Sequence, residues 1–118
     1  MSDIKSYQRL LAVQAIYETS INSNEVDATI DELLKYIIEN SNFKNKMHIS
    51  KLTLTKQIYN GVITNLNSID LILNKSLKNK SDAQSFDKLL LSIFRSAIFE
   101  LVLKKDISKK IINSEYLM

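Results

Sequence analysis

The sequence predicts an all-α protein, a compact bundle of five to six helices, and three observations support this prediction. The chain has 118 residues but only one glycine and no proline. Hairpins and tight turns usually need these residues, so the composition disfavours an all-β fold. Apolar residues recur every three to four positions along most of the chain, which is the period of an amphipathic helix. Apolar residues make up 45% and charged residues 25% of the chain, as in globular proteins with a single core.

Two amphipathic helices are predicted in the first part of the chain. Ser2 or Asp3 can cap the first helix, which runs to about Ser20. Its expected buried side comprises Leu10, Leu11, Val13, Gln14, Ala15, Ile16, Tyr17 and Ile21. A second helix is expected from about Asp27 to Glu39 after a polar connection. Its apolar stripe comprises Ile30, Leu33, Leu34, Ile37 and Ile38. Each stripe must be covered by another element.

A third helix is predicted to start at Ser50. Its apolar period continues as far as Leu77, with an expected break near residues 65–68. Gly61, the only glycine, falls inside this helix, where glycine costs about 1 kcal/mol relative to alanine. We expect close approach by another helix to be the reason for it.

The most apolar stretch, residues 89–103, is predicted to be the central helix, led into by Asp82 or Ser85. Its expected buried face comprises Leu90, Ile93, Phe94, Ala97 and Leu101, widened by Leu91, Ile98 and Val102. Its polar strip is only Ser92, Arg95 and Ser96. A helix with so narrow a polar strip should be wrapped by other helices, and it is too short to span a bilayer, which takes about 20 apolar residues. A last helix should follow, capped by Asp106 or Ser108.

The residue inventory disfavours catalysis. The chain has no cysteine and one histidine, His48, which excludes multi-histidine or thiolate zinc sites and leaves acid–base catalysis without an evident partner. One glycine inside a helix cannot form a phosphate-cradling loop. Asp27 and Asp31 suit the N-terminal dipole of their helix better than a catalytic role. We therefore expect no enzyme, no cofactor and no metal site. The lack of cysteine is also compatible with a reducing cytoplasm.

The positive features of the sequence are basic. The net charge of +3 is a mild preference for polyanions. Lys5 and Arg9 lie four residues apart on one helix edge and could contact two phosphates, while Tyr7 or Tyr17 stacks a base. The alternative interpretation is an ordinary solvated helix face.

Arg95 is the most informative charge of the central helix. Arginine is rarely buried without a partner, so Arg95 should either pair internally or reach a ligand through a gap. Glu100 lies about 140° round the helix from Arg95, so the two cannot pair along it. Lys104, four residues further, is the expected partner of Glu100.

Four segments, in order, resemble motifs of the NusB family of bacterial transcription antitermination factors. Residues 9–17, RLLAVQAIY, are similar to the family's R-x-x-A-x-Q-A-L-Y, and residues 61–65, GVITN, to its G-V-x-x-N. Residues 93–101, IFRSAIFEL, look like I-L-R-x-A-x-Y-E-L. Residues 106–116, DISKKIINSEY, are similar to D-I-P-x-K-V-x-I-N-E-Y.

The resemblance implies a single NusB-like helical domain over residues 1–118 that lacks the family's final helix. It also implies a cytoplasmic factor that binds single-stranded boxA-type RNA and pairs with NusE, a small-subunit ribosomal protein, in the RNA polymerase antitermination complex. By matching positions, Lys5 and Arg9 would contact RNA phosphates, Tyr17 would lie at the RNA or partner surface, and Arg95 would lie near the partner.

Other functions are left open at this point. A similar helical domain occurs at the N-terminus of certain ribosomal RNA cytosine methyltransferases, so the chain could be the RNA-binding part of an enzyme. A helical scaffold that binds no RNA is the third alternative. A homodimer is left open, and no membrane association is expected.

Overall fold

The computed structural model describes residues 2–22, 29–41, 48–77 and 87–104, and in these ranges it contains helices and no strand. The elements are α1 (Ser2–Ile21), α2 (Ile30–Glu39), the 3₁₀ turn η1 (Ile49–Lys51), α3 (Thr53–Thr64), α4 (Leu66–Ser76), α5 (Lys88–Ile98) and the π-helical turn η3 (Phe99–Leu103). The all-α prediction is confirmed. The expected final helix and the start signals Asp82 and Ser85 lie outside the described residues. None of the described helices is long and apolar enough to cross a membrane.

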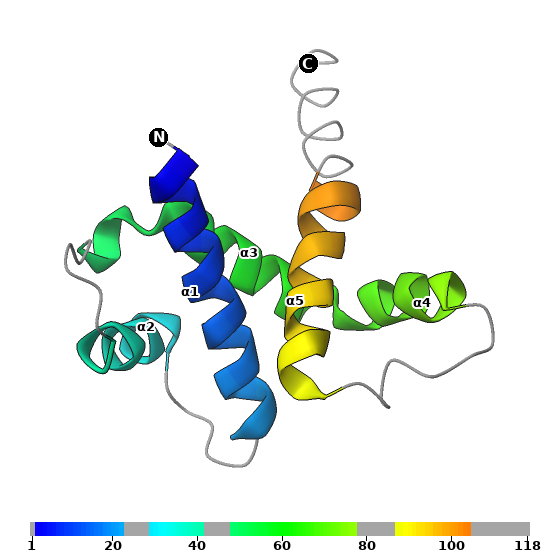
Figure 1. Ribbon diagram of the computed structural model, residues 1–118, viewed down its shortest axis with the longest axis horizontal. Helices are drawn as coiled ribbons and strands as arrows, with labels where there is room; N and C mark the ends of the chain where they lie inside the picture. The colour runs from blue at the N-terminus through cyan, green and yellow to red at the C-terminus, as the bar shows by residue number, and fades with distance from the viewer. Residues whose placement is uncertain (1, 23–28, 42–47, 78–86, 105–118) are drawn as a thin grey trace, which may run out of the picture.

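Helices α1 and α5 stand side by side and run in opposite directions at the centre of the molecule (Figure 1). Side-chain contacts join α1 to the α5–η3 segment at both ends. Arg9 in the first half of α1 pairs with Glu100 in η3, directly after α5, and Lys88 at the start of α5 donates to the carbonyl oxygen of Ser20 at 3.1 Å. Helix α3 packs on α1, while α2 lies beside α1 and α4 beside α5 (Figure 1).

Helix α1 contributes to two hydrophobic clusters. Leu11 and Ala15 pack against α2 and Leu52, whereas Ala12 and Ile16 belong to a cluster of α3, α4 and η3 residues. The stripe predicted for α1 was therefore partly wrong: Leu10 and Ile21 are exposed, and Ala12 is fully buried. The reason is that α2, α3 and α5 cover adjoining sides of α1, which turns the buried side away from Leu10.

Gln8, a buried polar residue of α1, caps helix α3. Its side-chain oxygen accepts hydrogen bonds from the backbone N–H groups of Leu54 at 2.9 Å and Thr55 at 3.3 Å. The Thr55 hydroxyl donates to the Gln8 carbonyl oxygen at 2.8 Å. The first N–H groups of a helix have no partner within it, and Leu52, at the N-cap position, provides no side-chain acceptor. Gln8, 46 positions before Leu54 in the chain, thus caps α3. The spacing of apolar residues did not predict this cap.

Gly61 lies against the aromatic ring of Phe99, and any Cβ atom at this position would collide with that ring. The prediction of close approach at Gly61 is confirmed. The predicted break is also confirmed: α3 ends at Thr64 and α4 begins at Leu66, with Asn65 donating from its backbone and side-chain nitrogens to the Gly61 carbonyl oxygen.

Several helix starts differ from the prediction. Helix α2 begins at Ile30, where the Thr29 hydroxyl accepts from the Glu32 N–H at 3.2 Å. The turn η1 precedes α3, which begins at Thr53 rather than Ser50. Asp87 caps α5, accepting from the Leu90 N–H at 3.0 Å. Short polar side chains such as Thr29 and Asp87 can accept from first-turn N–H groups, and α2 and α5 begin directly after them.

The prediction for α5 was right about its central place and wrong about its face. The buried side comprises Leu91, Ser92, Arg95, Ser96 and Phe99. Of the apolar side predicted to be buried, only Leu91 at its edge is buried and Ile98 is half-buried, while the other residues are exposed. Two of the inward polar groups have partners: Ser92 donates to the Lys88 carbonyl oxygen at 2.7 Å, and Arg95 pairs with Asp70. The buried Ser96 hydroxyl has no hydrogen-bond partner among the described residues. Small serine side chains also let a neighbouring helix approach closely. Periodicity alone therefore could not identify the inner face of this helix.

Candidate nucleic-acid interface

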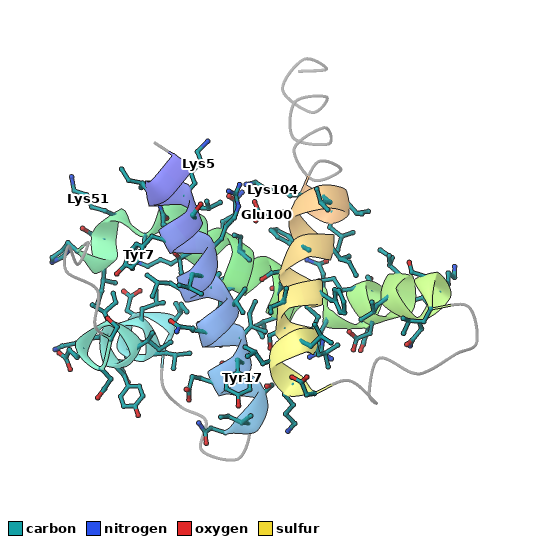
Figure 2. The ribbon with its side chains drawn as sticks, in the orientation of Figure 1. Lys5, Tyr7, Tyr17, Lys51, Glu100 and Lys104 are labelled. Carbon is teal, nitrogen blue, oxygen red and sulfur yellow. The ribbon has the colours of Figure 1, made fainter. Side chains whose placement is uncertain are left out.

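Lys5 lies near the end of the molecule where α1 begins (Figure 2). Arg9 follows it by about one helical turn, and both residues are exposed. Their spacing of four residues places both side chains on the same face of the helix. The Arg9 side chain is 50% exposed. The structure thus brings together two of the three residues predicted to contact RNA.

Arg9 is held in place by a carboxylate that lies far away in the sequence. Its Nε donates to Glu100 Oε1 at 2.9 Å, which joins α1 to η3. The expected pairing of Glu100 with Lys104 was wrong: among the ion pairs of the described ranges, the partner of Glu100 is Arg9. The cause is the antiparallel packing of α1 on α5 (Figure 1), because it brings the first half of α1 next to η3.

The π-helical turn η3 carries Glu100 to this position. Single π turns are rare and are often found at functional sites, because the wider turn redirects the side chains that follow. Phe99, at its start, packs against Gly61 and anchors the turn to α3. Glu100 follows directly and faces α1. The sequence thus identified Glu100 as a paired residue but predicted the wrong partner, Lys104 instead of Arg9.

The Arg9 guanidinium stays protonated at any pH at which RNA is stable. The hydrogen bond to Glu100, and then the negative charge of Glu100, raise the pKa of the Arg9 guanidinium above its already high usual value. An arginine in this state is a permanent cation with planar donors, which match the geometry of a phosphate.

Tyr17 lies at the opposite end of α1 from Lys5 (Figure 2). The helical rise places it about 12 Å beyond Arg9 along the axis. It lines a hollow of about 380 Å³ between α1, α2 and the first turn of α5, together with Gln14, Tyr36 and Leu89 among others. The structure therefore does not bring Tyr17 together with the two cations, and a ligand that contacted all three would have to follow α1 along most of its length.

Arg95 is turned inward. It is 8% exposed, and its Nε and Nη2 donate to both carboxylate oxygens of Asp70, at 2.9 and 2.8 Å. This fork-to-fork pair joins α5 to α4 and uses two of the five N–H donors of the guanidinium. The sequence left open whether Arg95 pairs internally or reaches a ligand, and the geometry shows the internal pair. A contact with a partner protein stays a prediction.

A second hollow, of about 350 Å³, is lined by residues of α2, η1 and α3, including Asp31, Lys56 and His48. His48 Nδ1 accepts from the Ser50 N–H at 3.2 Å and caps η1. Lys56 pairs with Asp31 at 3.0 Å. These contacts give each group a structural role. Across the ranges that the structure describes, no three potential metal ligands come together.

Comparisons with known proteins agree on one family. The model of the NusB family matches residues 6–117. The chain is 29% identical over 117 residues to the transcription antitermination protein NusB of Rickettsia akari (strain Hartford), covering 95% of this chain and 75% of that protein. The NusB protein of Rickettsia bellii (strain OSU 85-389) is 30% identical over 115 residues, with coverage of 95% and 74%. That of Caulobacter vibrioides is 26% identical over 112 residues, with coverage of 95% and 75%. No solved structure matches the chain.

Proposed function

The chain belongs to the NusB family of transcription antitermination proteins, and from this premise we propose that it binds single-stranded boxA-type RNA together with NusE. In this role it is a binding module of the RNA polymerase antitermination complex and catalyses no reaction. Lys5 and Arg9 contact RNA phosphates, Tyr17 contacts a base or the partner, and Arg95 lies near the NusE surface.

The observation that carries the proposal is the exposed pair of cations on α1. Lys5 and Arg9 share one face, and Arg9 is oriented by Glu100 while its side chain stays half exposed. An ordinary solvated face needs no such orientation. Phosphate contacts supply much of the affinity of nucleic-acid-binding proteins and make it depend on salt.

The test is the double variant Lys5→Met/Arg9→Met, titrated with boxA-type RNA and NusE at several salt concentrations. Binding should weaken at low salt. For single-stranded RNA each phosphate contact contributes about 0.7 to the slope of log K against log salt, so the slope should become shallower by about 1.4. Methionine keeps most of the side-chain length but removes the charge.

A matched control is Lys35→Met/Lys75→Met, which removes two exposed lysines from α2 and α4. It should leave the slope nearly unchanged. The assignment of Lys5 and Arg9 is wrong if their double variant binds like the parent protein at every salt concentration. The proposed function itself is wrong if a folded parent protein binds no RNA with or without NusE.

A further inference from the structure

Arg9 and Arg95 each meet a carboxylate, but they meet it in different ways. Arg95 gives Nε and Nη2 to both oxygens of Asp70, and its side chain is 10% exposed. Arg9 gives only Nε to Glu100, and its side chain is 50% exposed. Within the described ranges no hydrogen bond of its Nη atoms is found. Its guanidinium is therefore fixed on one edge, while the other donors face solvent.

Two lysines flank this pair at the same end of the molecule. Lys5 precedes Arg9 by one turn of α1, and Lys104 follows Glu100 by about one turn at the end of η3. Because α1 and α5 are antiparallel, both steps lead toward the same end (Figure 2). Lys5, Arg9 and Lys104 therefore lie at the same end of the molecule as Glu100, and these three positive charges and one negative charge sum to +2.

We propose that Glu100 and Lys104 complete the RNA-phosphate site that Lys5 and Arg9 begin. Glu100 is a positioning residue: it holds the Arg9 guanidinium by Nε so that the Nη donors face a phosphate. Lys104 supplies a third cation from η3. The inference rests on the proposed function and extends the phosphate path from the single helix α1 to the junction of α1 with η3.

Folding stability is a poor explanation for the Arg9–Glu100 ion pair and the nearby Lys104. Exposed ion pairs of this kind contribute little to folding, because solvent screens them and ordering long side chains costs entropy. Lys104 has no ion pair within the described part of the chain. An oriented arginine with an excess of neighbouring positive charge is, by contrast, what a bidentate phosphate contact requires.

Lys104→Met tests the third cation in the same RNA and NusE titration. The slope of log K against log salt should become shallower by about 0.7, which corresponds to about fivefold weaker binding at 0.1 M salt. Lys75→Met is the matched control, since it removes an exposed lysine from the last turn of α4. If the two variants bind alike while Lys5→Met/Arg9→Met is impaired, the role of Lys104 is wrong and the proposed function stands.

Glu100→Ala tests positioning, because positioning and simple electrostatics predict opposite results. Removing a negative charge near phosphates should tighten binding, whereas releasing Arg9 should weaken it. We expect Glu100→Ala to weaken binding several-fold and Glu100→Gln, which keeps an acceptor for Arg9 Nε, to bind at least as well as the parent. In an Arg9→Met background, Glu100→Ala should cause no further loss.

Circular dichroism of each variant separates loss of binding from loss of folding. Tighter or unchanged binding by a folded Glu100→Ala variant overturns the positioning role, as does an equal loss in the Arg9→Met background. If Glu100→Ala does not fold, Glu100→Gln decides, and weaker binding than the parent overturns the inference. A folded parent protein without RNA binding overturns the inference and the proposed function together.

Discussion

At the scale of single residues, the surroundings of two arginines decide what each can do. The Arg95 guanidinium is largely buried and uses two donors on Asp70, so its first role is to join α5 to α4. A charge in such a place is tolerated only while it is paired and hydrogen-bonded. The exposed Arg9 keeps donors for a ligand. The sequence placed Arg9 on a helix edge and Arg95 in an apolar helix, but it did not show which carboxylate each arginine meets.

Asp70→Ala should therefore lower the free energy of unfolding by about 3–5 kcal/mol, since it leaves the Arg95 guanidinium buried without its partner. Urea denaturation followed by circular dichroism measures the change. The control Asp70→Leu/Arg95→Met removes both charges and should recover most of the loss. A stable Asp70→Ala variant would contradict a structural role. The double variant, if folded, also tests NusE binding in the absence of Arg95.

At the scale of elements, α5 shows that the more apolar face of a helix is not always the buried one. Leu91 and Phe99 are buried together with Ser92, Arg95 and Ser96, while Leu90, Ile93, Phe94, Leu101 and Val102 are at least 36% exposed. The serines permit close packing and the arginine has a carboxylate within reach on α4. A polar group inside a protein costs little once it is hydrogen-bonded, so the Asp70 carboxylate on α4 allows Arg95 to lie on the buried face.

Truncation of the two faces should have unequal effects. Leu91→Ala should destabilise the protein by about 2–5 kcal/mol, because it opens a cavity beside Leu73 and Ile98. Ile93→Ala, on the exposed face, should change stability by about 0.5 kcal/mol or less. Thermal and urea denaturation of the two variants provide the comparison. Equal losses, or a larger loss for Ile93→Ala, would contradict the assigned orientation of α5.

At the scale of the whole molecule, α1 joins the two hydrophobic clusters into one unit. Leu11 and Ala15 belong to the cluster with α2, and Ala12 and Ile16 to the cluster with α3, α4 and η3. The Gln8 cap adds a polar link from α1 to the start of α3. Neither cluster can lose α1 without exposing part of the other, so the described helices should unfold as one cooperative unit.

Leu11→Ala and Ile58→Ala test this cooperativity, because each opens a cavity in a different cluster. Both should lower the single midpoint of urea denaturation, with equal midpoints from far-ultraviolet circular dichroism and tyrosine fluorescence. The parent protein is the control, and its urea midpoints from circular dichroism and from tyrosine fluorescence should also be equal. Two separate transitions, or a variant that shifts only one probe, would show that the clusters unfold independently.

Much of the fold was predictable because it depends on local pattern. The stripe of α2 is confirmed at Leu34, Ile37 and Ile38. The break at Asn65 followed from the polar run there, and the only glycine signalled a close contact. Of the candidate site, the shared edge of Lys5 and Arg9 followed from their spacing. Glu100 as the partner of Arg9 could not be found in this way, because the two are 91 positions apart.

The sequence by itself thus determined the helical class, most of the helices and the cationic edge of α1, since these follow from spacing within one helix. Only the tertiary structure decided which face of α5 is inside, what Gln8 caps and which arginine keeps free donors. Each of these depends on a group that another helix brings within hydrogen-bonding distance. The spacing of apolar residues along one helix contains no information about which groups of other helices lie next to it.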